Sequence, residues 1–169
     1  MTNPTRGGQH DTSGDWPKDE TDMSRFKGKL VLVFLEGKDR PTIRGGRALW
    51  GVQRELSYRT GGATADAEEL ITVPAGFVTD LASIPRAVWS FYPPDGPWAK
   101  AAIIHDFLYF TKGSGEWHGR IGVSRGRAYS RSEADAILKE GMADRDVGKW
   151  EQFVIWASVR LGGGRGWGT

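Results

Sequence analysis

The sequence predicts an α+β domain in which a small antiparallel sheet from the first half packs against a helical second half. Three observations support this prediction. Apolar and polar residues alternate with a period of two in the first half, which is typical of strands with one buried face. The second half contains a segment that is apolar on nearly every side of a helix, which indicates a buried central helix. The length of 169 residues suits one domain.

Strands are expected along the first half of the domain. Residues 26–35 form a β-rich run. Residues 50–58 alternate between apolar and polar side chains, although Arg54 interrupts the apolar face. Residues 71–77 alternate again and lead the chain to Asp80. These three segments are the predicted strands of the sheet.

Helices are expected in the second half. The first begins after residues 95–97, where an aspartate can cap the helix and a proline suits its first turn. The second begins with residues 130–133, a capping box in which serine and glutamate satisfy each other's backbone amides. It places two charges, Arg131 and Asp135, within or beside its apolar stripe. The third, residues 150–161, is apolar on most sides and ends at a glycine.

Both ends of the chain differ in composition from the middle. Residues 1–25 are rich in threonine, glycine, aspartate and proline, and we expect a disordered arm because they bury too little apolar surface. Residues 164–169 form a glycine-rich tail with one tryptophan, which we expect to be flexible. The single α+β domain is therefore predicted to span residues 26–163.

Composition and charge exclude several classes of function. The formal net charge is only +2, so nucleic acid binding by a broad positive field is disfavoured. A loop with four arginines (120, 125, 127 and 131) is interpreted as a solvated edge. The absence of cysteine excludes disulfides and thiolate chemistry. Neither a membrane-spanning segment nor the apolar region of a secretory signal is apparent.

Polar residues lie within the predicted central helix. His105, Asp106 and Tyr109 fall on one side of this helix, and its other sides are apolar. His105 and Asp106 are therefore expected inside the protein. An ionisable group that is buried without a partner is strongly destabilising, so each needs a charged neighbour, a metal ion or water.

This constellation has two interpretations. In the first, neutral His105 takes a proton from water, Asp135 on the opposing helix holds its other ring nitrogen, and Tyr109 hydrogen-bonds Asp135. Asp106, about 100° away around the helix, would then bind a hard cation such as calcium. In the second, the network is structural: His105 binds a carbonyl group and Arg131 pairs with Asp135.

Residues 73–85 form the other dense stretch of candidate residues. A strand ends near Asp80, and a short helix is expected to begin at residues 82–85, with Asp80 or Ser83 as its cap. The functional alternative makes Asp80 a further carboxylate near His105 and a metal ligand. Ser83 is a weak nucleophile candidate because it lacks the strained turn that activates a serine.

Four segments together carry a resemblance to a known family. Their order and spacing resemble a domain family of unknown function found in bacteriophages and prophages, over roughly residues 26–163. The resemblance implies a phage or prophage source, often near virion and tail genes, and no settled activity. The segments are Val73-Pro74-x-Gly76-Phe77-x-Thr79-Asp80-x-Ala82-Ser83-Ile84-Pro85, His105-Asp106-x-Leu108-Tyr109, Ser130-Arg131-x-Glu133-Ala134-Asp135 and Val159-Arg160-x-x-Gly163.

A looser resemblance concerns chemistry. His105-Asp106-x-x-Tyr109, with Asp135 on a second helix, is similar to the catalytic helices of secreted phospholipases A2. There the histidine activates water, the next aspartate binds calcium, and a tyrosine and a distant aspartate brace the histidine. This chain has no cysteines where that family is disulfide-rich, lacks its glycine-rich calcium loop and begins with strands. The resemblance therefore supports the geometry more than the substrate.

The leading hypothesis is a phage-encoded, hydrolase-like protein. His105 is its general base, Asp135 and Tyr109 support His105, and Asp106 and Asp80 are metal ligands, with calcium as the expected ion. An ester or lipid bond is favoured slightly over a cell-wall bond. The alternative is a non-catalytic virion or tail-associated component that docks to other phage proteins. The expected location is the host cytoplasm or the virion.

Overall fold

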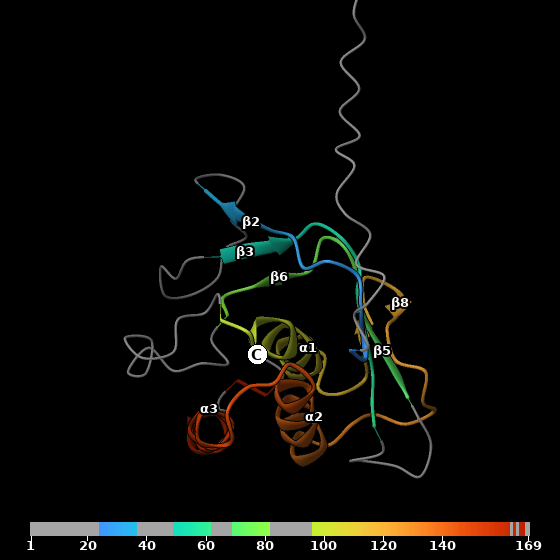
Figure 1. Cartoon of the computed structure of the whole chain (residues 1–169). Helices are drawn as coiled ribbons and strands as arrows, with labels where there is room; N and C mark the ends of the chain where they lie inside the picture. Colours follow the sequence, from blue (N-terminus) through green and yellow to red (C-terminus); the bar gives the residue numbers. More distant parts are fainter. Residues whose placement is uncertain are drawn as a thin grey trace, which may run out of the picture.

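The computed structural model describes residues 24–36, 49–61, 69–81, 96–162, 164 and 166–167. The helices are α1 (Ala99–Phe110), α2 (Arg131–Asp144) and α3 (Lys149–Gly162). The strands are β1 (Phe26–Lys27), β2 (Leu32–Leu35), β3 (Leu49–Val52), β4 (Leu56–Arg59), β5 (Leu70–Val73), β6 (Val78–Thr79), β7 (Glu116–Trp117) and β8 (Arg120–Ile121). Strands come first and helices dominate the second half, so the α+β prediction is confirmed (Figure 1).

The first two predicted strands are each divided in two, and the third ends early as β5 and is followed by β6, beyond its predicted end. The two parts of each fall in separate sheets. β1, β4 and β5 pair in that order, and β2, β3 and β6 pair in the same way. All of these pairings are antiparallel. The expected single sheet is therefore an antiparallel meander whose three long strands are all broken at the same height. The two resulting sheets lie along different sides of α1 (Figure 1).

Backbone geometry explains where the meander is interrupted. Gly28, between β1 and β2, has a φ of +95°, and a Cβ there would come within 2.6 Å of the Glu55 carbonyl oxygen. Gly76, between β5 and β6, has a φ of +89° and donates its amide to the Val52 carbonyl oxygen at 2.7 Å. The break between β1 and β2 thus contacts the break between β3 and β4, and the break between β5 and β6 contacts the end of β3. A side-chain-bearing residue is strained at both glycine positions.

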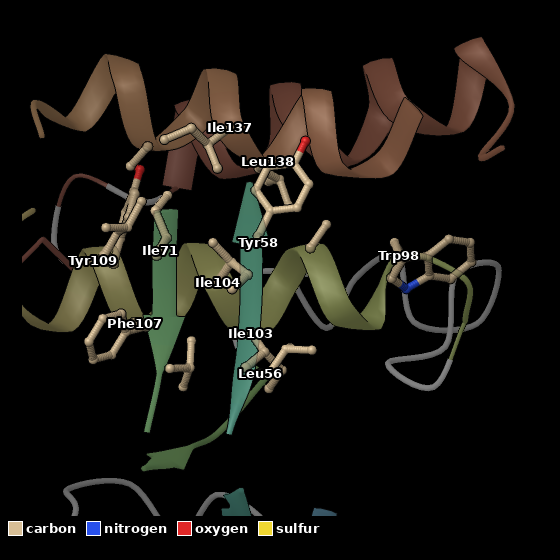
Figure 2. Packing of buried hydrophobic residues seen from close by; sticks show 14 of the residues in the cluster. Leu56, Tyr58, Ile71, Trp98, Ile103, Ile104, Phe107, Tyr109, Ile137 and Leu138 are labelled. Atoms are coloured by element: carbon tan, nitrogen blue, oxygen red, sulfur yellow. The ribbon is translucent and has the colours of Figure 1, made fainter. Parts of the chain in front are cut away.

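The central helix α1 is buried, as predicted. It is covered by β4 and β5 on one side and by α2 on another (Figure 2). Side chains from these elements, such as Leu56, Ile71 and Ile137, are at most 1% exposed. Gly141 of α2 allows the two helices to approach, since a Cβ there would lie 3.0 Å from the side chain of Ala101. The buried residues of α1 are Ala101, Ala102, Ile103, Ile104, His105, Phe107, Leu108 and Tyr109.

The helix starts agree only partly with the sequence predictions. The capping box of α2 is confirmed: the Ser130 hydroxyl accepts from the Glu133 amide at 3.2 Å, and the Glu133 carboxylate accepts from the Ser130 amide at 2.7 Å. The N-cap of α1 is Trp98, which makes no capping hydrogen bond with its side chain. Asp95, the expected cap, lies outside the described residues.

The third helix is less buried than its composition indicates. Only Gln152, Ile155 and Val159 of α3 are buried, and they share one side of the helix. Apolar residues on the opposite side, such as Trp150 and Leu161, are exposed. Among the described residues, none of the helices combines the length and the apolar character needed to cross a bilayer.

The predicted terminal segments are described only in part. Residues 1–23 of the predicted arm lie outside the described residues, whereas Ser24 donates its hydroxyl to Asp144 at 2.7 Å. In the predicted tail, the ring of Trp167 lies edge-on against Tyr109, with 5.0 Å between centroids. The domain boundaries themselves stay predictions.

Candidate functional site

A buried histidine and a buried aspartate meet between α1 and α2. His105 Nε2 lies 3.0 Å from Asp135 Oδ1, and each side chain is 1% exposed. The expected pairing of these residues across the two helices is therefore present. Asp135 faces Nε2, whereas Asp106 faces Nδ1 at 4.0 Å, so Asp135 is the closer of the two carboxylates that flank the ring.

Tyr109 reinforces this pair from one turn further along α1. Its hydroxyl donates to Asp135 Oδ1 at 2.6 Å, and its ring lies 4.1 Å from the His105 ring between centroids. The hydroxyl also accepts from Arg131 Nε at 3.0 Å. The side chain points from α1 toward α2 (Figure 2). The four-residue spacing places Tyr109 directly beside His105 on the helix surface.

Arg160 of α3 completes the surroundings of Asp135. Its Nη1 donates to Asp135 Oδ2 at 2.9 Å, so both carboxylate oxygens are engaged. Arg131 does not pair with Asp135 as the structural alternative predicts. Its Nη2 instead donates to the backbone carbonyls of Val159 at 3.3 Å and Arg160 at 2.6 Å. Sequence reasoning missed Arg160 as a site residue, although Val159-Arg160 belongs to the motif pattern quoted above.

Asp106 occupies a different position from Asp135. Its Oδ1 lies 4.0 Å from His105 Nδ1, and its side chain is 14% exposed. Its Oδ2 accepts a hydrogen bond from the hydroxyl of Thr79 at the end of β6. Asp80, the other predicted metal ligand, follows Thr79 directly and is partly buried. The part of the chain that the structure describes contains no cluster of three acidic or histidine side chains able to hold a metal ion.

Burial and charge set the protonation of this group. Burial alone would lower the pKa of His105, but the carboxylates of Asp106 and Asp135 outweigh it and raise that pKa above its ordinary value. Burial alone would raise the pKa of Asp135, but hydrogen bonds from His105, Tyr109 and Arg160 outweigh it and lower that pKa. Burial, with the bond to Asp135, raises the pKa of Tyr109 to about 12. Asp135 is therefore ionised and Tyr109 neutral near pH 7.

Two further predictions concern residues near this site. Ser83 and the expected short helix at 82–85 lie outside the described residues. The interpretation of the arginine loop as a solvated edge is wrong for Arg125, whose side chain is 5% exposed and lies between Glu69 and Glu133 at 3.3 and 3.0 Å. Arg127 also binds Glu133, at 2.7 Å. The Arg125 guanidinium therefore joins Glu69, directly before β5, to Glu133 in the first turn of α2.

Comparisons with known proteins show a family without an assigned activity and a partial similarity to a second group of proteins. Over 62 residues the chain is 36% identical to UPF0260 proteins of Haemophilus influenzae strains PittEE and Rd, a match that covers 37% of this chain. The chain spans about two fifths of the length of these curated relatives. No solved structure matches the chain. Residues 50–159, which include His105 and Asp135, match the family described as "Protein of unknown function (DUF1353)", and the chain belongs to that family.

Proposed function

We propose that the protein is a hydrolase in which His105 is the general base that activates water. The observation that carries this proposal is the hydrogen bond from His105 Nε2 to Asp135, together with the bond from Tyr109 to the same carboxylate oxygen. A carboxylate in this position holds the imidazole in one tautomer and stabilises the imidazolium that forms when the ring takes a proton. Both supporting groups are themselves held by arginines.

The proposed step is hydrolysis of an ester. His105 Nδ1 takes a proton from water while the water oxygen bonds to the ester carbonyl carbon. The resulting tetrahedral oxyanion then collapses, the bond to the alkoxy oxygen breaks, and Nδ1 returns its proton to the leaving alcohol. The products are a carboxylic acid and an alcohol, and His105 is regenerated. General base catalysis of this kind typically contributes about 10²–10⁴-fold to a rate.

Asp106 is the side chain that would hold a calcium ion, with Asp80 as a second ligand. Calcium prefers carboxylate and other oxygen ligands, and its chemistry in such a site is to stabilise the oxyanion. Asp106 supports this assignment because it is more exposed than Asp135 and adjoins His105. Measuring hydrolysis with added calcium and with a chelator tests it, and equal rates in both contradict it.

The proposed substrate is an ester or lipid, ahead of a cell-wall bond, and the proposed source is a phage or prophage. The test is hydrolysis of short 4-nitrophenyl esters, phospholipid vesicles and peptidoglycan by the purified full chain. We expect the wild type to cleave one of the first two and His105→Gln to lose about 10²-fold or more. Ser132→Ala, an exposed change at the start of α2, is the matched control. A wild type that cleaves none, or a His105→Gln variant that keeps its activity, contradicts the proposal.

A second candidate function is a non-catalytic virion or tail component whose polar core is structural. The observation that favours it is the closed set of ion pairs around Asp135, in which His105 is 1% exposed. Under this proposal His105→Gln lowers the melting temperature, and no hydrolytic activity exists to lose. Under the hydrolase proposal the same variant still melts cooperatively while its activity disappears.

A further inference from the structure

The outer face of α3 is apolar although it faces solvent. We define this outer face by Trp150, Phe153 and Leu161, which are 70%, 50% and 90% exposed. With about 3.6 residues per turn, these residues lie on the side of the helix opposite Ile155 and Val159, which are buried. α3 thus has one apolar side that packs against the domain and a second that the described residues leave uncovered.

Charged residues are confined to the flanks of this outer face. Lys149 lies on one flank, and Lys139 of α2 joins it, since its Nζ is 5.7 Å from the ring centroid of Trp156. Arg160 lies on the same flank but is paired with Asp135. On the other flank the carboxylate of Glu151 accepts from the Gly148 amide at 3.0 Å. The flank that carries Lys139 and Lys149, which we call the basic flank, is therefore positively charged.

The composition of the outer face and its flank favours a bilayer over a second copy of the chain. Its three large side chains expose roughly 400 Å² of apolar surface, given about 150–250 Å² for a full aromatic side chain. A standard protein interface takes about 800 Å² from each partner, of which roughly 450 Å² is apolar, so the apolar area alone fits either occupant. The lysines on the flank favour the lipid surface, because helices that lie in such a surface combine Trp, Phe and Leu with Lys and Arg.

We propose that the outer face of α3 docks on the surface of an anionic phospholipid bilayer. Trp150, Phe153 and Leu161 enter the boundary between headgroups and acyl chains, and Lys139 and Lys149 of the basic flank contact lipid phosphates. Docking in this way goes beyond the hydrolase activity proposed above and does not depend on it.

The position of α3 relative to the candidate site also indicates a substrate. Leu161, the most exposed of the three, directly follows Arg160, which binds Asp135. A bilayer on the outer face would therefore lie next to the helix end that holds the site. Resting on the proposed function, this places membrane phospholipid ahead of cell-wall material as the ester that His105 hydrolyses.

The test is co-sedimentation of the full chain with vesicles of phosphatidylcholine, with and without about 30% phosphatidylglycerol. We expect binding to the anionic vesicles that weakens at high salt. The double variant Trp150→Ser, Leu161→Ser should bind the anionic vesicles at least about tenfold more weakly than the wild type. Ile121→Ser is the matched control, since Ile121 is 72% exposed and its strand β8 lies away from α3 (Figure 1), and it should bind as the wild type does.

Several outcomes would overturn the docking proposal. Wild-type protein that stays in the supernatant would contradict docking, and so would a double variant that binds as well as Ile121→Ser. A dimer in sedimentation velocity that dissociates in the double variant assigns the face to a second copy instead. His105→Gln separates docking from catalysis, because it should bind vesicles as the wild type does. A variant that loses hydrolysis and keeps binding leaves the docking proposal intact. Wild-type protein that binds vesicles without hydrolysing them contradicts only the proposed activity.

Discussion

Two sides of α1 are equally buried and very differently built. Phe107 is 0% exposed and meets Phe77 edge-on, with 5.4 Å between ring centroids. His105, on the other side of the helix, is 1% exposed and meets a carboxylate. Burial of Phe107 stabilises the fold without any particular partner geometry. Burial of His105 is tolerated only because Asp135 and its neighbours satisfy one another, so this side of α1 depends on partner geometry in a way that the apolar side does not.

The largest expected effect comes from removing the carboxylate at the centre of the polar side. Asp135→Ala leaves His105, Tyr109 and Arg160 without their common acceptor, and we expect a loss of about 3–5 kcal/mol in the free energy of unfolding. Urea denaturation followed by circular dichroism measures this loss. A loss below about 1 kcal/mol would mean that water satisfies the hydrogen bonds that His105, Tyr109 and Arg160 lose.

The comparison requires a matched change on the apolar side. Phe107→Ala should cost a similar amount, about 3–5 kcal/mol, but by forming a cavity and not by leaving charges unpaired. Its cost should therefore be the same at pH 5.5 and pH 8.5, whereas the cost of Asp135→Ala should differ between the two. Equal pH profiles for both variants would remove the distinction between the two sides of α1.

The pH dependence of stability sharpens the comparison further. Because Asp106 and Asp135 raise the pKa of His105 despite its burial, the stability from its protonated ring is fully present below about pH 6.5. That stability should be lost as pH rises through the raised pKa, by at most about 1.4 kcal/mol per pH unit. Thermal melts in chelator from pH 5.5 to 9 measure it, and His105→Gln should flatten the profile.

The proposed activity should follow the opposite trend. A general base acts in its neutral form, so hydrolysis should increase over the same pH range in which the melting temperature decreases. A hydrolysis rate that falls as pH rises through this window would exclude neutral His105 as the base.

Asp135 affects stability at acid pH. Its lowered pKa gives stability that is present above about pH 3.9 and is lost as the pH falls through that lowered pKa.

A smaller effect is expected at the start of α2. Ser130→Ala removes the hydroxyl that accepts from the Glu133 amide, and should lower stability by about 1 kcal/mol. The change leaves the ion pairs of Asp135 in place. Ser132→Ala, two residues on and outside the capping box, should change stability by less than half as much. Chemical denaturation of the two variants side by side checks this order.

The smallest effect is expected on the outer face of α3. Leu161 is 90% exposed, so Leu161→Ser should change the free energy of unfolding by no more than about 0.5 kcal/mol. Such a result shows that this apolar residue does not support the fold, which is the condition for using it as a docking variant. A loss above about 2 kcal/mol would place Leu161 in the core.

The sequence predicted local features better than long-range ones. The capping box at Ser130 and the all-round apolar α1 depend on neighbouring residues, so both could be read directly. The meeting of His105 and Asp135 was also predictable, because a buried charge requires a partner. The breaks in the strands were not predicted, although Arg54, which interrupts the apolar face of residues 50–58, lies between β3 and β4, where the sheets separate. Arg160 was missed because an arginine at the end of a helix usually faces solvent.

The hydrogen bonds from Arg131 to the Val159 and Arg160 carbonyls have a consequence for how the molecule opens. Helix ends generally fray first and exchange their amide hydrogens fastest. Here the final turn of α3 is fastened to a guanidinium that also holds Tyr109. Local unfolding of that turn would therefore also release Arg131 from Tyr109, which supports the His105–Asp135 pair. Slow amide exchange at Val159 would then report that the His105 ring is held in place.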